Sequence, residues 1–105
     1  MASAESIKAA MDFSATYQWA RGAAFRRETF GGIVYHYEGL RPDPRMVFVP
    51  SPFLSGLLER MDQGSLRDLI DAATEKFSLN QEQVRAVESF FAELLQQGTI
   101  QGAGC

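Results

Sequence analysis

The sequence contains very little cysteine and histidine. Its single cysteine, Cys105, is the last of 105 residues, and its single histidine is His36. One thiol cannot form an internal disulfide, and these two residues cannot supply a Cys/His metal pattern. We therefore expect no disulfide, no metal site and no cofactor. The cysteine content also favours a cytoplasmic setting.

Long apolar runs and an excess of positive charge are also missing. Residues 1–14 include Glu5, Lys8 and Asp12 and no continuous apolar run, which predicts neither a signal peptide nor a membrane span. Ten Lys and Arg residues stand against 13 Asp and Glu residues, so the net charge is −3. This balance disfavours a phosphate backbone as partner. We expect neither a membrane nor a nucleic acid among the partners.

Length and composition fit one ordinary globular domain. Hydrophobic residues make up 46% of the chain and charged residues 22%, both close to the average for such domains. We expect a flexible N-terminal arm over residues 1–14, a folded domain over residues 15–100 and a disordered tail over residues 101–105.

Residues 17–49 have the composition of β-strands, with many aromatic and β-branched side chains. Gly31 and Gly32 give a permissive turn before the second strand. In that strand, alternation places Tyr35 and Tyr37 on one face and His36 on the other. We expect one wetter side to the sheet, with His36 on an exposed or partner-facing surface.

The segment between Glu38 and Arg45 contains two prolines, Pro42 and Pro44. Proline has no amide hydrogen and cannot continue a strand ladder. The segment is therefore predicted to be a hairpin loop that leads into a third strand.

The period of the apolar residues becomes helical after Pro50. Ser51 before Pro52 is a typical start for a first helix, which Gly64 ends. Ser65 with Asp68 three residues later resembles a capping box and opens a second helix.

The third helix has the clearest start signal. Asn80 with Gln83 opens it, and Gly98 ends it. The order of elements predicts a small α+β domain of winged-helix type, in which a three-stranded antiparallel sheet is followed by three helices.

Few residues could carry catalysis. His36 has no cysteine or second histidine to act with, and Asp68 and Asp71 are more typical of a solvated helix face than of a catalytic pair. Gly31 and Gly32 are not followed by the lysine and hydroxyl residue of a phosphate loop. We therefore expect a protein without enzymatic activity.

The distribution of charge argues against DNA binding, although winged helices often bind DNA. The third predicted helix carries Glu82, Glu88 and Glu93 against Arg85, which would repel phosphate. Positive charge gathers instead in the strand region, where five arginines stand against three acidic residues. A winged-helix DNA-binding regulator and a structural dimerisation module remain as alternatives.

A peptide-binding surface is the sharper hypothesis. The six large apolar residues of the third helix spread over about 140° of its circumference, which is wider than a core-facing stripe needs to be. A helix wedged between two other elements would explain this equally well. In the alternative explanation, one edge of the stripe forms the wall of a groove beside the short apolar strand that ends at Val49. An extended peptide would bind in this groove as a further strand. The residues predicted to bind it are Met46, Val47, Phe48, Val49, Val87, Phe90 and Leu94.

The stretch from Phe25 to Tyr37 resembles the signature of mycofactocin-system chaperones, which are small proteins of the PqqD-like family of peptide recognition elements. The signature residues are Phe25, Arg26, Glu28, Phe30, Gly31 and Tyr35. The resemblance continues through Arg45, Phe48, Val49, Ser51 and Pro52, and more loosely to Ile100. It covers about four-fifths of the chain, and its first stretch is the specific part.

This resemblance implies a non-catalytic protein with a winged-helix-like fold. Such a protein binds a ribosomally synthesised precursor peptide and presents it to a radical S-adenosylmethionine (SAM) maturase in the biosynthesis of the redox cofactor mycofactocin. The peptide's leader docks between the third strand and the third helix. Residues Arg26, Glu28, Phe30, Gly31 and Tyr35 would shape the turn or contact the maturase. The loop from Glu38 to Arg45 is longer and richer in proline than the family pattern.

Overall fold

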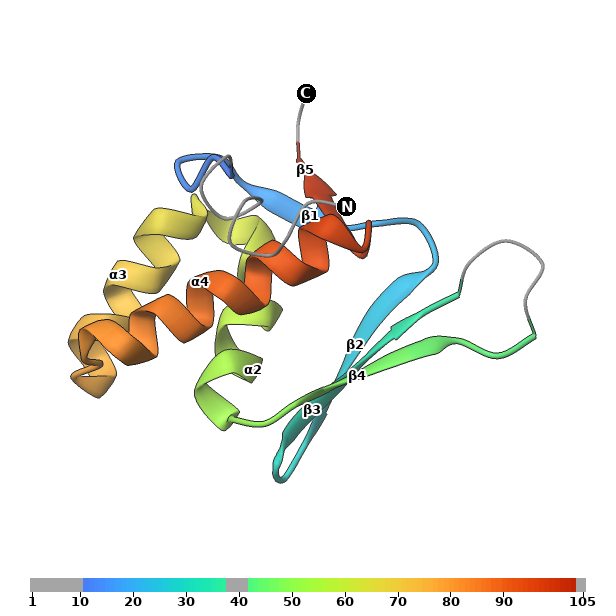
Figure 1. Ribbon diagram of the computed structural model, residues 1–105, viewed down its shortest axis with the longest axis horizontal. Coiled ribbons are helices and arrows are strands. Elements are labelled where there is room, and N and C mark those ends of the chain that lie inside the picture. Colours follow the sequence, from blue (N-terminus) through green and yellow to red (C-terminus); the bar gives the residue numbers. More distant parts are fainter. Residues whose placement is uncertain (1–10, 38–41, 104–105) are drawn as a thin grey trace.

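A three-stranded antiparallel sheet forms one end of the molecule. The computed structural model describes residues 11–37 and 42–103. Strands β2 (Ala23–Glu28), β3 (Gly31–His36) and β4 (Arg45–Val49) lie in the order β2-β3-β4 (Figure 1). Phe25 pairs with Val34, and Val34 pairs with Val47, so a row of apolar side chains crosses the sheet.

The tight turn between β2 and β3 requires glycine at position 31. Gly31 has a φ of +145°, and a Cβ added there would clash with the carbonyl oxygen of Val49. The hydroxyl of Ser55 also donates a hydrogen bond to the carbonyl oxygen of Gly31. The turn is therefore packed against the start of the helical region, and a side chain at Gly31 would be strained.

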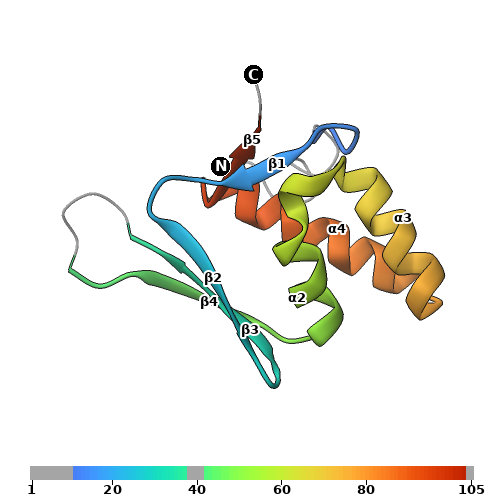
Figure 2. The ribbon, with the colours of Figure 1, turned by 180° about the vertical axis from the view of Figure 1, so that it is seen from behind.

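Three helices pack together beside the sheet: α2 (Pro52–Glu59), α3 (Leu66–Phe77) and α4 (Gln81–Gln96). The chain is confirmed as a small α+β domain with antiparallel sheets and three helices. Figure 2 shows the sheet projecting from one end of the helical layer. Among the described residues, none of these helices has the length and apolar character needed to cross a membrane.

The predicted helix starts are largely confirmed. Ser65 accepts a hydrogen bond from the backbone N–H of Asp68 at 3.1 Å, and Asn80 and Gln83 form a full capping box. The first helix is shorter than predicted, because α2 ends at Glu59. A 3₁₀ turn, η1 (Met61–Gln63), then carries the chain toward Gly64 and buries Met61.

The two ends of the described chain pair with each other, which corrects the prediction of a disordered tail. Strand β1 (Tyr17–Trp19) pairs antiparallel with β5 (Ile100–Gly102). Ala103 continues the contact, because its N–H bonds to the carbonyl oxygen of Thr16 at 2.8 Å. The sequence pattern misses this strand because it is only three residues long and Ile100 is its only large apolar residue. Residues 104–105 lie outside the described residues.

The end of the predicted N-terminal arm also packs on the domain. Met11 is buried in the core, and the carbonyl oxygen of Phe13 accepts a hydrogen bond from the N–H of Arg67 at 2.6 Å. A flexible arm is therefore wrong for residues 11–14, because an apolar side chain and backbone hydrogen bonds hold this segment. The rest of the predicted arm, residues 1–10, lies outside the described residues. Residues 38–41 of the predicted hairpin loop lie outside them as well.

The core lies between the helices and the inner face of the sheet. Phe91, Leu58, Ile70 and Val34 are among its fully buried side chains. Ala73 of the second predicted helix is buried, but Phe77 at the end of α3 is 50% exposed. The last turn of α3 therefore reaches beyond the core.

His36 lies on the inner face of the sheet, which corrects its predicted exposure. Its side chain is only 8% exposed, whereas Tyr37, the next residue, is exposed. The sequence correctly predicted that His36 and the two tyrosines lie on opposite faces of the strand, but it assigned His36 to the exposed face. His36 can be buried because two residues supply polar partners at its Nδ1 atom. Arg45 stands opposite it in the hairpin, and Thr99 is 63 residues away in sequence.

Candidate functional site

Strand β4 is an edge strand of the described sheet, as predicted. It pairs with β3 on one side, and no described strand pairs with its other side. In an antiparallel ladder, every second residue directs its N–H and C=O groups to the same side. The outer side of β4 therefore offers backbone donors and acceptors to an incoming strand.

The predicted site residues of β4 divide between two faces. Met46 is 51% exposed and Phe48 is 64% exposed, whereas Val47 is half-buried and Val49 is fully buried. Only Met46 and Phe48 therefore present large side-chain surfaces to a ligand. Val49 belongs to the core and could contribute only backbone groups.

The predicted site residues of α4 are mostly core residues. Val87 and Leu94 are buried, and Phe90 alone of the three is half-buried. The prediction that Val87 and Leu94 line an open groove is therefore not supported. For these two residues, the wide apolar stripe reflects a helix packed between other elements. Phe90 rests edge-on against Phe91, with ring centroids 6.0 Å apart, and keeps part of its surface accessible.

Arg45 ties the start of β4 to the end of α4. Its guanidinium donates to the carbonyl oxygen of Gln97 at 2.9 Å and lies 3.4 Å from the hydroxyl oxygen of Thr99. It also lies 3.1 Å from Nδ1 of His36, and because arginine only donates, that nitrogen accepts. A cation at this end of a helix is favourable. Sequence reasoning missed this cluster, although Arg45 and His36 stand opposite each other in the hairpin.

Four of the six signature residues, Arg26, Glu28, Phe30 and Tyr35, lie on the outer face of the sheet, whereas Phe25 packs against the core and Gly31 is buried in the turn. Arg26 donates to Glu28 at 2.6 Å, and its guanidinium carbon lies 5.6 Å from the centre of the Tyr35 ring. Tyr35 pairs in register with Met46. The Phe30 and Phe48 rings are 6.3 Å apart. We use "outer face" for this surface, which consists of Arg26, Glu28, Phe30, Ile33, Tyr35, Met46 and Phe48.

The outer face is unusually apolar for an exposed surface. Phe30, Met46 and Phe48 are all large and exposed, and the nearby Tyr37 is exposed as well. Contiguous apolar patches of this kind commonly mark interaction sites. Its charged residues, Arg26 and Glu28, neutralise each other in an exposed ion pair.

Two side chains with shifted pKa values lie away from this site, near β1. Hydrogen bonds from the hydroxyl and the N–H of Ser14 lower the pKa of Asp12. Burial raises the pKa of Tyr17, whose hydroxyl donates to the backbone carbonyl of Asp12 at 3.0 Å. Within residues 11–37 and 42–103, no group of three His, Cys, Asp or Glu side chains is placed to hold a metal ion.

Over the described residues, the geometry defines a small α+β domain in which no strand pairs with the outer edge of β4 and the outer face of the sheet is apolar. No family model matches the chain, and comparisons with curated proteins and with solved structures give no significant match.

Proposed function

We propose that this protein is a non-catalytic peptide-binding module that accepts an extended peptide as a further strand on β4. One observation carries the proposal: within residues 11–37 and 42–103, no strand pairs with the outer edge of β4, which lies directly beside the exposed side chains of Met46 and Phe48. Strand addition uses the backbone for affinity and adjoining side-chain contacts for selectivity.

The magnitudes require apolar contacts as well as backbone pairing. Ordering each peptide residue costs about 1–2 kcal/mol, while each backbone hydrogen bond returns about 0.5–1.5 kcal/mol. Backbone pairing alone therefore contributes almost no net binding free energy. A buried apolar anchor adds about 1.5–3 kcal/mol, and Met46, Phe48 and Phe90 have accessible surface to receive such anchors.

The link through Arg45 supports a site that uses both β4 and α4. Arg45 bonds to the carbonyl oxygen of Gln97, and Phe90 precedes Gln97 by two helical turns, or about 10 Å. An extended peptide covers that distance in about three residues. A peptide of ordinary length could therefore pair with β4 and also reach Phe90.

The resemblance to PqqD-like recognition elements supports a more specific form of the proposal. In that form the fold is winged-helix-like, and the guest is a ribosomally synthesised precursor peptide. The module delivers this peptide to a radical SAM maturase for the biosynthesis of mycofactocin. The signature residues of the outer face, Arg26, Glu28, Phe30 and Tyr35, would then shape the turn or contact the maturase, while Met46 and Phe48 receive the peptide.

Substitutions at the β4 side of the site test the proposal most cleanly. We expect Phe48→Asp to weaken binding of a synthetic precursor peptide by about 10- to 100-fold, because one apolar anchor is lost. Calorimetry measures the affinity. Phe77→Asp is the matched control, since Phe77 is similarly exposed but lies on α3. Equal affinities for the wild type and Phe48→Asp would contradict the site.

Phe90→Asp tests the α4 side. We expect it to weaken peptide binding while the circular dichroism spectrum and the unfolding midpoint stay close to those of the wild type. A variant that unfolds would instead show that Phe90 acts as a core residue. The α4 side would then have to be removed from the proposed site.

A dimerisation module is the second candidate, and the exposed outer face favours it. Two copies could cover Phe30, Met46 and Phe48 by packing these faces together. Light scattering with and without the precursor peptide separates the two functions. A stable dimer that the peptide does not change would favour dimerisation, and a monomer that binds the peptide would favour the recognition module.

A further inference from the structure

A cavity between α2 and α3 has no role in the function proposed above. Its volume is about 360 Å³, and its wall includes Phe53, Leu57, Leu69 and Phe77. No residue of β4 or α4 lines it. It is therefore separate from the edge of β4, and a ligand bound in it would be independent of the proposed function.

The floor of this cavity is open because α2 has a glycine there. Gly56 lines the cavity, and a Cβ added at Gly56 would meet no atom within 4 Å. Glycine weakens the interior of a helix by about 0.5–1 kcal/mol relative to alanine. Packing therefore does not require this glycine, and its effect is to keep space free beside the aromatic side chains.

One side of the cavity ends in an aromatic pair, half-buried Phe53 and exposed Phe77. The Phe53 and Phe77 rings lie 5.8 Å apart at 41°, and Phe77 is 50% exposed at the last residue of α3. An apolar side chain entering the cavity would cover this aromatic surface. Burial of one such side chain is the largest favourable contribution available here.

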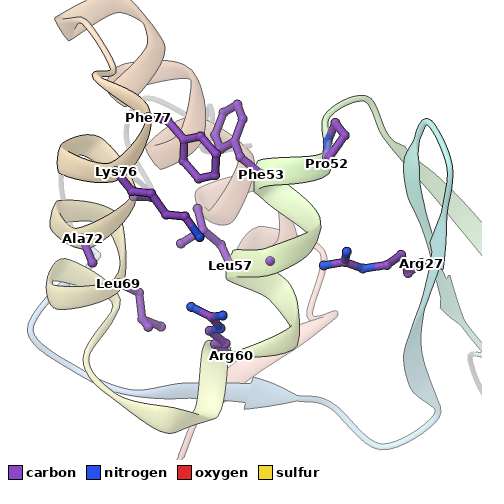
Figure 3. A pocket seen from close by; sticks show the side chains of 11 residues that line it. Arg27, Pro52, Phe53, Leu57, Arg60, Leu69, Ala72, Lys76 and Phe77 are labelled. Carbon is purple, nitrogen blue, oxygen red and sulfur yellow. The ribbon is translucent and has the colours of Figure 1, made fainter.

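Three cationic side chains surround the opening. They are Arg27 from β2, Arg60 at the end of α2 and Lys76 from α3. Figure 3 shows the nitrogen-bearing ends of Arg60 and Lys76 directed into the space between α2 and α3, and the guanidinium of Arg27 directed toward α2 from the sheet. Among the described residues, no carboxylate lines the cavity, although the chain as a whole has a net charge of −3. The local positive charge is therefore complementary to an anionic ligand.

The three cations are not equally available. Arg27 already pairs with Glu59 at 2.5 Å on the exposed side of α2. Lys76 lies 5.4 Å from the centre of the Phe77 ring, where its amine sits at the border between apolar and polar surface. We expect Arg60 and Lys76 to provide most of the attraction for a ligand.

We propose that this cleft binds an acidic peptide segment of a partner protein. The segment inserts one aromatic or large aliphatic side chain between Phe53, Leu57 and Phe77, and its flanking carboxylates lie beside Arg60 and Lys76. The volume is at the low end of ligand pockets, which span about 300–1,000 Å³. This volume fits one anchor side chain of a longer peptide. The carboxylates of that peptide would then lie beside the positive charges at the opening of the cavity.

Isotope-labelled full-length protein and three synthetic peptides test this proposal. The probe is the capped peptide Glu-Asp-Trp-Leu-Glu-Asp. One control replaces its acids by Gln and Asn, and the other replaces Trp and Leu by Ala. We expect NMR shifts centred on Gly56, Arg60, Leu69, Lys76 and Phe77 with the probe, and weaker binding of both controls. Equal binding of the uncharged control, or shifts centred elsewhere, would overturn the proposal.

Two protein variants separate the apolar and the charged contributions. Gly56→Leu fills the cavity without meeting another atom at its Cβ, and we expect it to reduce affinity for the probe at least tenfold. Arg60→Gln combined with Lys76→Gln should reduce affinity about fivefold to tenfold and flatten its dependence on salt. Arg85→Gln, a change on exposed α4 surface, is the charge control and should bind like the wild type. Unchanged binding by both cleft variants would contradict the proposal.

The same variants distinguish this cleft from the edge of β4. Gly56→Leu should leave binding of the precursor peptide unchanged, and Phe48→Asp should leave binding of the acidic probe unchanged. If Gly56→Leu abolished binding of both peptides, the two surfaces would not be separate sites and the inference would fail.

Discussion

Arg45 shows how a single residue fixes the position of the proposed binding strand. It joins β4 to the end of α4 through Gln97 and Thr99, and it also contacts buried His36. Removing it would leave several polar atoms without their donor. A lost hydrogen bond that leaves a buried group unsatisfied costs about 1–3 kcal/mol.

We predict that Arg45→Met lowers the free energy of unfolding by about 2 kcal/mol or more. Arg45→Lys should recover only part of this loss, because lysine lacks the fork of donors that reaches several acceptors. Arg26→Met, on the exposed outer face, should change stability by less than about 0.5 kcal/mol. Urea denaturation measures all three, and an Arg45→Met loss no greater than that of Arg26→Met would contradict the assigned role.

Gly31 gives a second prediction at the scale of one residue. Gly31→Ala should destabilise the fold by about 2 kcal/mol or more, because the position combines a left-handed φ with a clash against Val49. Gly64→Ala is the matched control, since its φ of 178° is ordinary extended backbone and its Cβ would meet no atom within 4 Å. Similar unfolding midpoints for the two variants would argue against this account of the turn.

At the scale of elements, the helices were largely predictable and the sheet faces were not. Ser65 and Asn80 marked helix starts because their side chains bond locally to the backbone. In β3, apolar and aromatic residues occur on both faces, so alternation alone could not choose the inner one. His36 is buried through Thr99, which is 63 residues away in sequence. Such long-range pairing leaves no local pattern.

The candidate site was partly predictable for the same reasons. The short apolar segment between prolines correctly indicated an edge strand, and Met46 and Phe48 are exposed as a binding site requires. Periodicity could not tell which apolar residues of α4 would be covered by the core, because this depends on how other elements pack on it. Val87 and Leu94 were therefore assigned to a groove although they are buried.

The pairing of β1 with β5 leads to a prediction about the chain's end. Truncation after Gly98 removes β5 and uncovers the core beside buried Tyr17, so we expect the free energy of unfolding to fall by at least about 2 kcal/mol. Truncation after Ala103 keeps β5 and should leave it nearly unchanged. Thermal unfolding of both forms is the measurement, and equal stability would mean that β5 contributes little to the fold.

At the scale of the whole molecule, the proposed functional surfaces are spatially separated. The edge of β4 and the outer face belong to the sheet, while the cavity bordered by Arg60 and Lys76 lies between α2 and α3. The helices and the inner face of the sheet share the core. This arrangement would allow the two proposed ligands, the precursor peptide and the acidic segment, to bind at the same time.

Amide hydrogen exchange of the full chain, with and without the precursor peptide, tests the central claim most directly. An added strand bonds only to those β4 groups that face the open edge, and these occur at every second residue. We predict that alternate amides between Arg45 and Val49 become protected when the peptide binds, while those already bonded to β3 change little. Tight peptide binding without that alternating protection in β4 would contradict strand addition.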